Sequence, residues 1–205
     1  MCDRMVGREY RYISTMPSFP FALDEAKTIA GLMREYNGRD DIRSVVHEGN
    51  LLNVKGISNE SKQFNYIFNR LSVTPESVRS IILDGDIVDS KYANLISIMI
   101  YDDLFREFVF EIYNEKRISS DPITDYDVMS FFEEKATESD VVAMWKYETL
   151  FKLRRLYCRI LFEAGFLKKS SGIREISTPF ISTPVIDVLR SNGYSDYIGA
   201  TVGRQ

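Results

Sequence analysis

Basic side chains gather in one stretch of this chain, between residues 146 and 174. The stretch holds eight lysines and arginines against two glutamates, although the whole chain has a formal net charge of -4. Cations at this density attract phosphate groups, because each contact releases counterions that are condensed on a nucleic acid. The candidate nucleic-acid-binding residues are Lys146, Lys152, Arg154, Arg155, Arg159, Lys168, Lys169 and Arg174.

The spacing of residues in this stretch predicts an amphipathic helix. On a helical wheel, Lys152, Arg155 and Arg159 stand almost opposite an apolar cluster, so we expect the apolar side to be buried and the basic side to face solvent. A solvated face without a ligand is the alternative interpretation. The apolar cluster consists of Leu150, Leu153, Tyr157, Ile160, Leu161 and Ala164.

Side chains that could support other chemistry are sparse. His47 is the only histidine, it falls at the end of a predicted helix, and no nucleophile-elbow or glycine-rich phosphate motif accompanies it. Cys2 and Cys158 have neither disulfide nor metal-ligand spacing, so we expect reduced thiols. We therefore predict that the protein is not an enzyme and has no catalytic residue, metal site, cofactor or small-molecule substrate. The acidic groups weighed as metal ligands are Asp84, Asp86 and Asp89, Asp102 with Asp103, and Glu133 with Glu134.

Helical periodicity dominates the first part of the chain. Capping and stop signals predict helices within residues 21–38, 40–48 and 60–71, and a further helix begins at about residue 76. Residues 90–117 are apolar nearly all round and predict a central, buried helix or helix pair, broken where Asp102 can cap a second helix.

The second part of the chain begins after a linker that we predict at residues 118–125. Thr124 and Asp127 form a capping-box pattern that opens the first of three helices, and Thr149 is the predicted cap of the third. Two strand-like pieces around Ser170 to Gly172 then predict a hairpin, and Thr183 begins a last helix. Three helices followed by a hairpin are typical of a winged helix. The predicted fold is mainly α, with a helical N-terminal domain at 1–120 and a winged-helix-like C-terminal domain with a small β-hairpin at 121–205.

Four segments, taken in order along the chain, resemble the BrxA family of bacterial BREX phage-defence systems. The resemblance implies a mostly helical cytoplasmic protein, encoded beside a methyltransferase, an ATPase and a phosphatase-like protein, with DNA binding as its activity. The family has also been likened in fold to the RNA-associated factor NusB, and labelled an inner-membrane protein. The longest apolar run here, at residues 93–101, is too short to span a bilayer. The segments are PSFPFALDEAKTIAGLM, SNESKQFNYIFNRL, YDDLFREFVFEIY and TLFKLRRLYCRILFEAGFL.

Three functions remain open from the sequence. We expect a non-enzymatic, cytoplasmic protein that binds double-stranded DNA through the basic helix and the wing, with other BREX components as further candidate partners and no membrane association. A protein–protein scaffold would instead require an exposed apolar patch. An RNA-binding protein is the third hypothesis, suggested by the NusB comparison.

Overall fold

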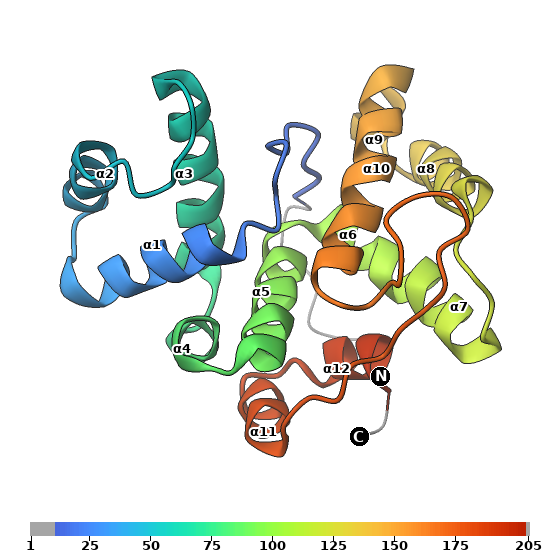
Figure 1. Ribbon diagram of the computed structural model, residues 1–205. Coiled ribbons are helices and arrows are strands. Elements are labelled where there is room, and N and C mark those ends of the chain that lie inside the picture. The colour runs from blue at the N-terminus through green and yellow to red at the C-terminus, as the bar shows by residue number, and fades with distance from the viewer. Residues whose placement is uncertain (1–10, 204–205) are drawn as a thin grey trace.

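A computed structural model describes residues 11–203 of the protein, and helices form nearly all of their regular structure (Figure 1). The predicted mainly helical class is confirmed. The elements are α1 (Leu23–Glu35), α2 (Arg39–Glu48), α3 (Ile57–Val73), α4 (Glu76–Asp84), α5 (Ile87–Tyr101), α6 (Asp103–Phe108), the π-helix η1 (Val109–Tyr113), α7 (Asn114–Ser119), α8 (Asp125–Glu138), α9 (Asp140–Ala143), α10 (Tyr147–Glu163), α11 (Thr183–Ser191) and α12 (Ser195–Thr201).

The central helix of the molecule is α5. Its sequence is apolar on every side, and most of its residues are buried. It ends at Asp102, whose Oδ1 accepts hydrogen bonds from the backbone amides of Leu104 (3.1 Å) and Phe105 (3.3 Å). An aspartate at this position satisfies amides that the first turn of a helix leaves unpaired. The predicted break in the central helix is therefore confirmed.

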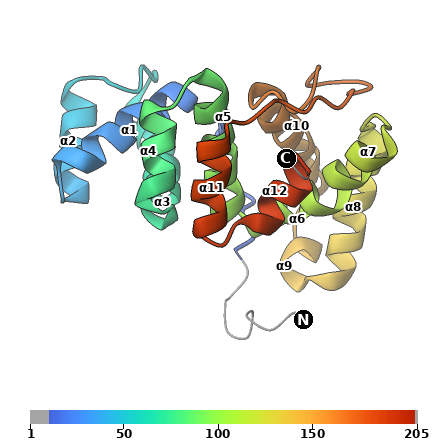
Figure 2. The same ribbon diagram turned by 90° about the horizontal axis from the view of Figure 1, so that it is seen from below.

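The other helices lie in two groups on either side of α5. Helices α1 to α4 form one group and α6 to α10 the other, while α11 and α12 lie beneath them (Figures 1 and 2). Helix α11 packs against α4, and α12 packs against η1. The C-terminal helix is fastened to the centre by a 2.7 Å hydrogen bond between the hydroxyls of Tyr92 and Thr201. The last helices thus tie the two groups together from below.

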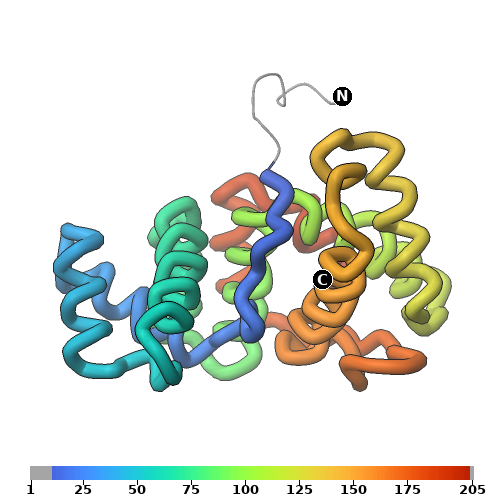
Figure 3. Tube along the Cα trace, turned by 90° about the horizontal axis from the view of Figure 1, so that it is seen from above, coloured from blue at the N-terminus to red at the C-terminus, as the bar shows by residue number. Residues whose placement is uncertain are grey.

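An extended N-terminal segment, residues 11–22, runs between α3 and α10 (Figure 3). Extended backbone that pairs with no strand must find other donors when it is covered. Here Gln63 donates to the carbonyl of Phe19 (2.9 Å), Arg70 to that of Pro20 (2.9 Å) and Asn94 to that of Phe21 (2.7 Å). Arg70 and Asn94 are fully buried and also bond to each other. These polar side chains fix the segment between the two groups of helices.

The predicted linker lies between α7 and α8. The capping box is confirmed, because Thr124 Oγ1 accepts from the Asp127 amide (3.3 Å) and Asp127 Oδ2 accepts from the Thr124 amide (2.7 Å). Aromatic rings pack across the predicted boundary, with 5.5 Å between the centroids of Phe108 and Phe131. The division into 1–120 and 121–205 stays a prediction.

The predicted β-hairpin at residues 166–177 requires a correction. Leu167 and Ile176 form an isolated antiparallel bridge, but Arg174 pairs with Ile123, which lies in the predicted linker just before α8. The Ile123 amide donates to Arg174 (2.9 Å) and the Arg174 amide donates back (3.0 Å). Because one arm changes partner, the described residues form bridges and no strand. The hairpin, and with it the winged helix, is not confirmed.

Two other expectations concern the ends of the chain and membranes. Among residues 11–203, no helix is both long and apolar enough to cross a membrane. Cys2 lies outside the described residues. Helix α12 was not among the predicted elements. Its Tyr197 packs edge-on against Phe110, with 5.4 Å between the ring centroids.

Candidate nucleic-acid interface

Helix α10 positions the first half of the basic stretch. Leu153, Tyr157 and Ile160 are fully buried, as the wheel predicts, and they anchor the helix to the core. The ring of Tyr157 lies 5.0 Å from that of Phe105 and 5.6 Å from that of Phe132, measured between centroids. This packing fixes which side of α10 is turned outward.

Four of the predicted cations line the outer side of α10. Lys146 and Arg155 are exposed, and neither forms an ion pair within residues 11–203. Lys152 is half-buried because its Nζ donates to the carbonyl of Met16 (2.9 Å) in the N-terminal segment. Arg159 pairs with Glu163 on the next turn (2.8 Å). The outer side is therefore basic, but the N-terminal segment covers part of it, which the wheel alone could not predict.

Three of the remaining four cations have acidic partners that we did not expect. Arg174 is buried, and both it and Arg154 pair with Asp125, at the first turn of α8. Lys168 pairs with Glu175 across the loop (2.7 Å), and Lys169 is exposed. Arg154 and Arg174 fasten α8 to α10 and to the loop, and the single carboxylate of Asp125 compensates part of their charge within the fold.

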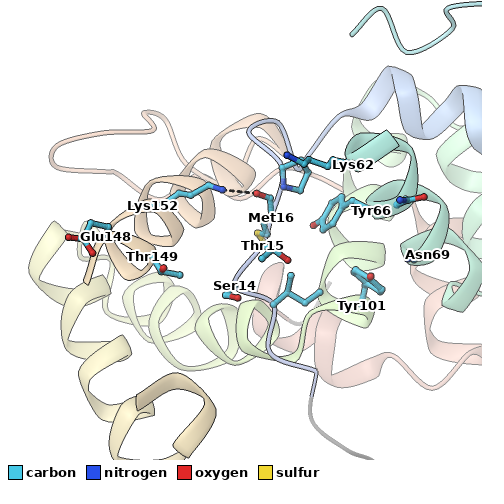
Figure 4. Close-up of a pocket in the computed structure, with 13 residues that line it drawn as sticks. Ser14, Thr15, Met16, Lys62, Tyr66, Asn69, Tyr101, Glu148, Thr149 and Lys152 are labelled. Carbon is cyan, nitrogen blue, oxygen red and sulfur yellow. Dashed lines mark hydrogen bonds between the residues drawn. The ribbon is translucent and has the colours of Figure 1, made fainter. Parts of the chain in front are cut away.

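A groove of about 680 Å³ separates α3 from α10. The N-terminal segment forms its floor, and Figure 4 places Lys62 of α3 and Lys152 of α10 on opposite sides of it. Both lysines also line a smaller pocket that contains Phe19. Each wall carries one lysine, Glu148 adds a carboxylate on the α10 side, and Ile13, Met16 and Pro17 make part of the lining apolar. Its remaining lining residues include Ser14, Thr15, Asn65, Tyr66, Asn69, Tyr101 and Thr149.

Lys62 is an interface candidate that the sequence did not indicate. It is exposed and forms no ion pair among the described residues. It belongs to a helix whose sequence, ISNESKQFNYIFNRLSV, has a net charge of only +1. Two arginines of α2 lie behind it, since Arg39 donates to Asn65 (2.9 Å) and Arg43 to Ser61 (3.4 Å). Of these three cations only Lys62 lines the groove, and only the folded arrangement places it opposite α10.

The other reactive side chains have structural partners. His47 lies 2.9 Å from a carboxylate oxygen of Glu60. Burial raises the pKa of the Cys158 thiol to about 11, so the thiolate that would react is scarce near neutral pH. Asp86 caps α5 through the amides of Val88 and Asp89. Within residues 11–203, no group of three or more acidic, histidine or cysteine side chains is arranged to hold a metal ion.

Comparison with known protein families finds one match along nearly the whole chain. The family model described as BrxA matches residues 10–193. A protein named "BREX protein BrxA" from Bacillus cereus (strain H3081.97) is 34% identical over 197 residues, which cover 96% of this chain and 98% of that protein. A second "BREX protein BrxA", from Paramagnetospirillum magneticum (strain ATCC 700264 / AMB-1), is 23% identical over 90% of this chain and 92% of its own length.

A solved structure has the same fold. The crystal structure of an uncharacterized protein from Magnetospirillum magneticum superposes with a TM-score of 0.81 and covers 94% of this chain and 98% of that one. The two sequences are 21% identical, so the likeness concerns the fold alone.

Proposed function

The chain belongs to the BrxA family, and from that premise we propose that it is a non-enzymatic, cytoplasmic accessory protein of a BREX phage-defence system that binds double-stranded DNA. Both named relatives are BREX proteins, so other BREX components are its candidate protein partners. DNA binding is the part of the proposal that depends on the geometry of the interface.

The observation that carries the proposal is the convergence of cations on one open groove. Lys62 on one wall and Lys152 on the other line the same space, and Arg155 continues the basic surface along α10. Lysine and arginine contacts to phosphates supply most non-specific DNA affinity, and the planar guanidinium can also bond to base edges. Lys146, Arg159 and Lys169 extend this surface.

We also propose that α10 and the loop at 166–177 act as a recognition helix with a wing-like loop. Helices α8, α9 and α10 followed by a loop have the order of a winged helix. The bridge between Arg174 and Ile123 and the ion pair between Arg174 and Asp125 hold the loop beside the start of α8. Lys169 supplies the loop's available charge, because Lys168 is already paired with Glu175.

A scaffold function is the second candidate, and a separate observation favours it. Val141 and Met144 are exposed around α9, and the Met144 side chain is 81% accessible. Exposed apolar side chains that lie together are typical of protein-binding surfaces. In this alternative the cations of α10 would contact an acidic partner protein in place of phosphates.

An electrophoretic mobility shift with duplex DNA, duplex RNA and single strands of each tests the proposal. We expect a shift of duplex DNA that weakens steeply as salt is raised, because phosphate contacts release counterions. Binding to duplex RNA in preference to DNA would favour the RNA-binding hypothesis. No shift with any nucleic acid would overturn the proposal in favour of the scaffold.

A further inference from the structure

Aromatic rings alternate with the cations along the outer side of α10. Tyr147 is 66% exposed at the start of the helix, and the ring centroid of Phe151, one turn later, lies 6.3 Å from its own. One turn further, the guanidinium of Arg155 lies 5.6 Å from the Phe151 ring centroid. Residues four apart share one face of a helix, so these three side chains form a continuous surface.

The surface continues onto the N-terminal segment. Phe19 is 56% exposed, and the guanidinium of Arg159 lies over its ring, 4.4 Å from the centroid. Arg159 therefore joins an exposed ring of the N-terminal segment to the helix. We call this set the aromatic stripe; it consists of Tyr147, Phe151, Arg155, Arg159 and Phe19.

The composition of the aromatic stripe suits one kind of ligand. Aromatic rings that stay exposed beside arginines can stack on the flat faces of nucleobases, while the guanidinium groups contact phosphates. The faces of bases inside a duplex are covered by their neighbours, so this stacking is available only to unpaired bases. A partner that offered negative charge alone would need the arginines but not the rings.

We propose that the aromatic stripe binds the unpaired nucleobases of a single-stranded segment, by stacking on Tyr147 and Phe19. This inference rests on the proposed function, because it assumes that nucleic acid lies along α10, and it adds a base-dependent contact to the phosphate contacts. DNA and RNA strands carry the same stacking faces, so both are candidate sources of the segment.

Fluorescence anisotropy with two labelled strands of equal length and charge tests the inference. One probe is oligodeoxyadenylate, and the other has abasic spacers in place of its bases; blunt duplex DNA is the third probe. We expect the full-length protein to bind the base-containing strand about tenfold more tightly than the abasic one. Tyr147→Ala should remove most of that ratio without changing duplex affinity, and Tyr147→Trp should retain it.

Phe180→Ala is the matched control, because Phe180 is an exposed ring before α11 and outside the stripe. It should leave the ratio unchanged. Equal affinity of the wild type for the base-containing and abasic strands, or an unchanged ratio in Tyr147→Ala, would overturn the inference while duplex binding preserved the proposed function. Loss of all binding, duplex included, would overturn both. An oligoriboadenylate probe with a larger ratio than its DNA counterpart would support the stripe and identify RNA as the source.

Discussion

The two sides of α10 differ in their environment: one packs in the core, and the other carries cations at the surface. On the inner side, Leu153, Tyr157 and Ile160 are fully buried against aromatic rings of other helices. On the outer side, Arg155 is exposed and Lys152 reaches only as far as the floor of the groove. The inner side can therefore be tested by stability and the outer side by binding.

Between these two sides, Arg154 forms an ion pair that stabilises the fold. We call this position the edge of α10. Arg154 extends from α10 to Asp125, which also receives the buried Arg174. Both arginines contribute to the excess of positive charge that the sequence suggests, but they share an ion pair with one acid of α8 and so serve the fold. Whether a cation is free to contact a ligand thus depends on whether an acid from a distant part of the chain lies beside it.

The largest expected effect is on the inner side. Leu153→Ala should lower the free energy of unfolding by about 2–5 kcal/mol, because it removes buried methyl groups and leaves a cavity. Urea denaturation followed by circular dichroism measures the change. A loss below about 1 kcal/mol would show that the inner side of α10 is not packed as described.

The edge should give the next largest effect. Asp125→Ala leaves Arg154 and Arg174 without their shared carboxylate, and the side chain of Arg174 is only 3% exposed. We expect a loss of about 2–3 kcal/mol, less than for a fully buried pair because Asp125 is half exposed.

The matched control for the edge is Glu175→Ala. It breaks the pair with Lys168, in which both side chains are 61% exposed, and such surface pairs contribute about 0–1 kcal/mol. Equal losses for Asp125→Ala and Glu175→Ala in the same urea experiment would contradict the structural assignment of Arg174.

A further effect depends on pH and concerns Asp102, between α5 and α6. Burial raises the pKa of Asp102 to about 8, against about 4 in the unfolded chain. The folded state then holds a proton that the unfolded state releases, so this contribution to stability is complete below pH 4 and is lost as the pH rises to about 8. The slope is on the order of 1 kcal/mol per pH unit within that window.

Asp102→Asn isolates this contribution, since asparagine is also a good helix cap and does not titrate. Thermal unfolding at pH 5 and pH 8 should show that the wild type loses more stability on going to pH 8 than the variant does. The same loss in both proteins would rule out a raised pKa for Asp102.

Local signals made much of the fold predictable. The capping box at Thr124 and the cap at Asp102 depend on residues two or three positions away, and both were recovered from the sequence. Thr149 was wrongly predicted as the cap of α10, because the helix begins at Tyr147 and Lys146 is its N-cap residue. An N-cap without a side-chain acceptor leaves no mark in the sequence.

Contacts between distant residues explain what the sequence could not predict. Asp125 precedes Arg174 by 49 positions, and Lys62 and Lys152 face the same groove only because α3 and α10 form its walls. Arg174 of the loop pairs with Ile123 and not with the other half of the loop, and this pairing also depends on tertiary contacts. The buried side of α10 was predictable because it depends on helical spacing alone.

The outer side should show a smaller effect on stability than the inner side does. Replacing Lys152, Arg155 and Arg159 together by alanine should cost about 1–2 kcal/mol, because the Lys152 bond to Met16 and the partly exposed Arg159–Glu163 pair are lost. Circular dichroism should show a folded protein. An unfolded triple variant would contradict the separation of the two sides.

Duplex DNA affinity measured against salt concentration, for the wild type and this triple variant, tests the central claim most directly. If the outer cations each neutralise one phosphate, the slope of log affinity against log salt should be about -4 to -5 in the wild type and shallower by about 2–3 in the variant. A folded triple variant that binds duplex DNA as tightly as the wild type, with the same slope, would contradict the claim and remove α10 from the interface.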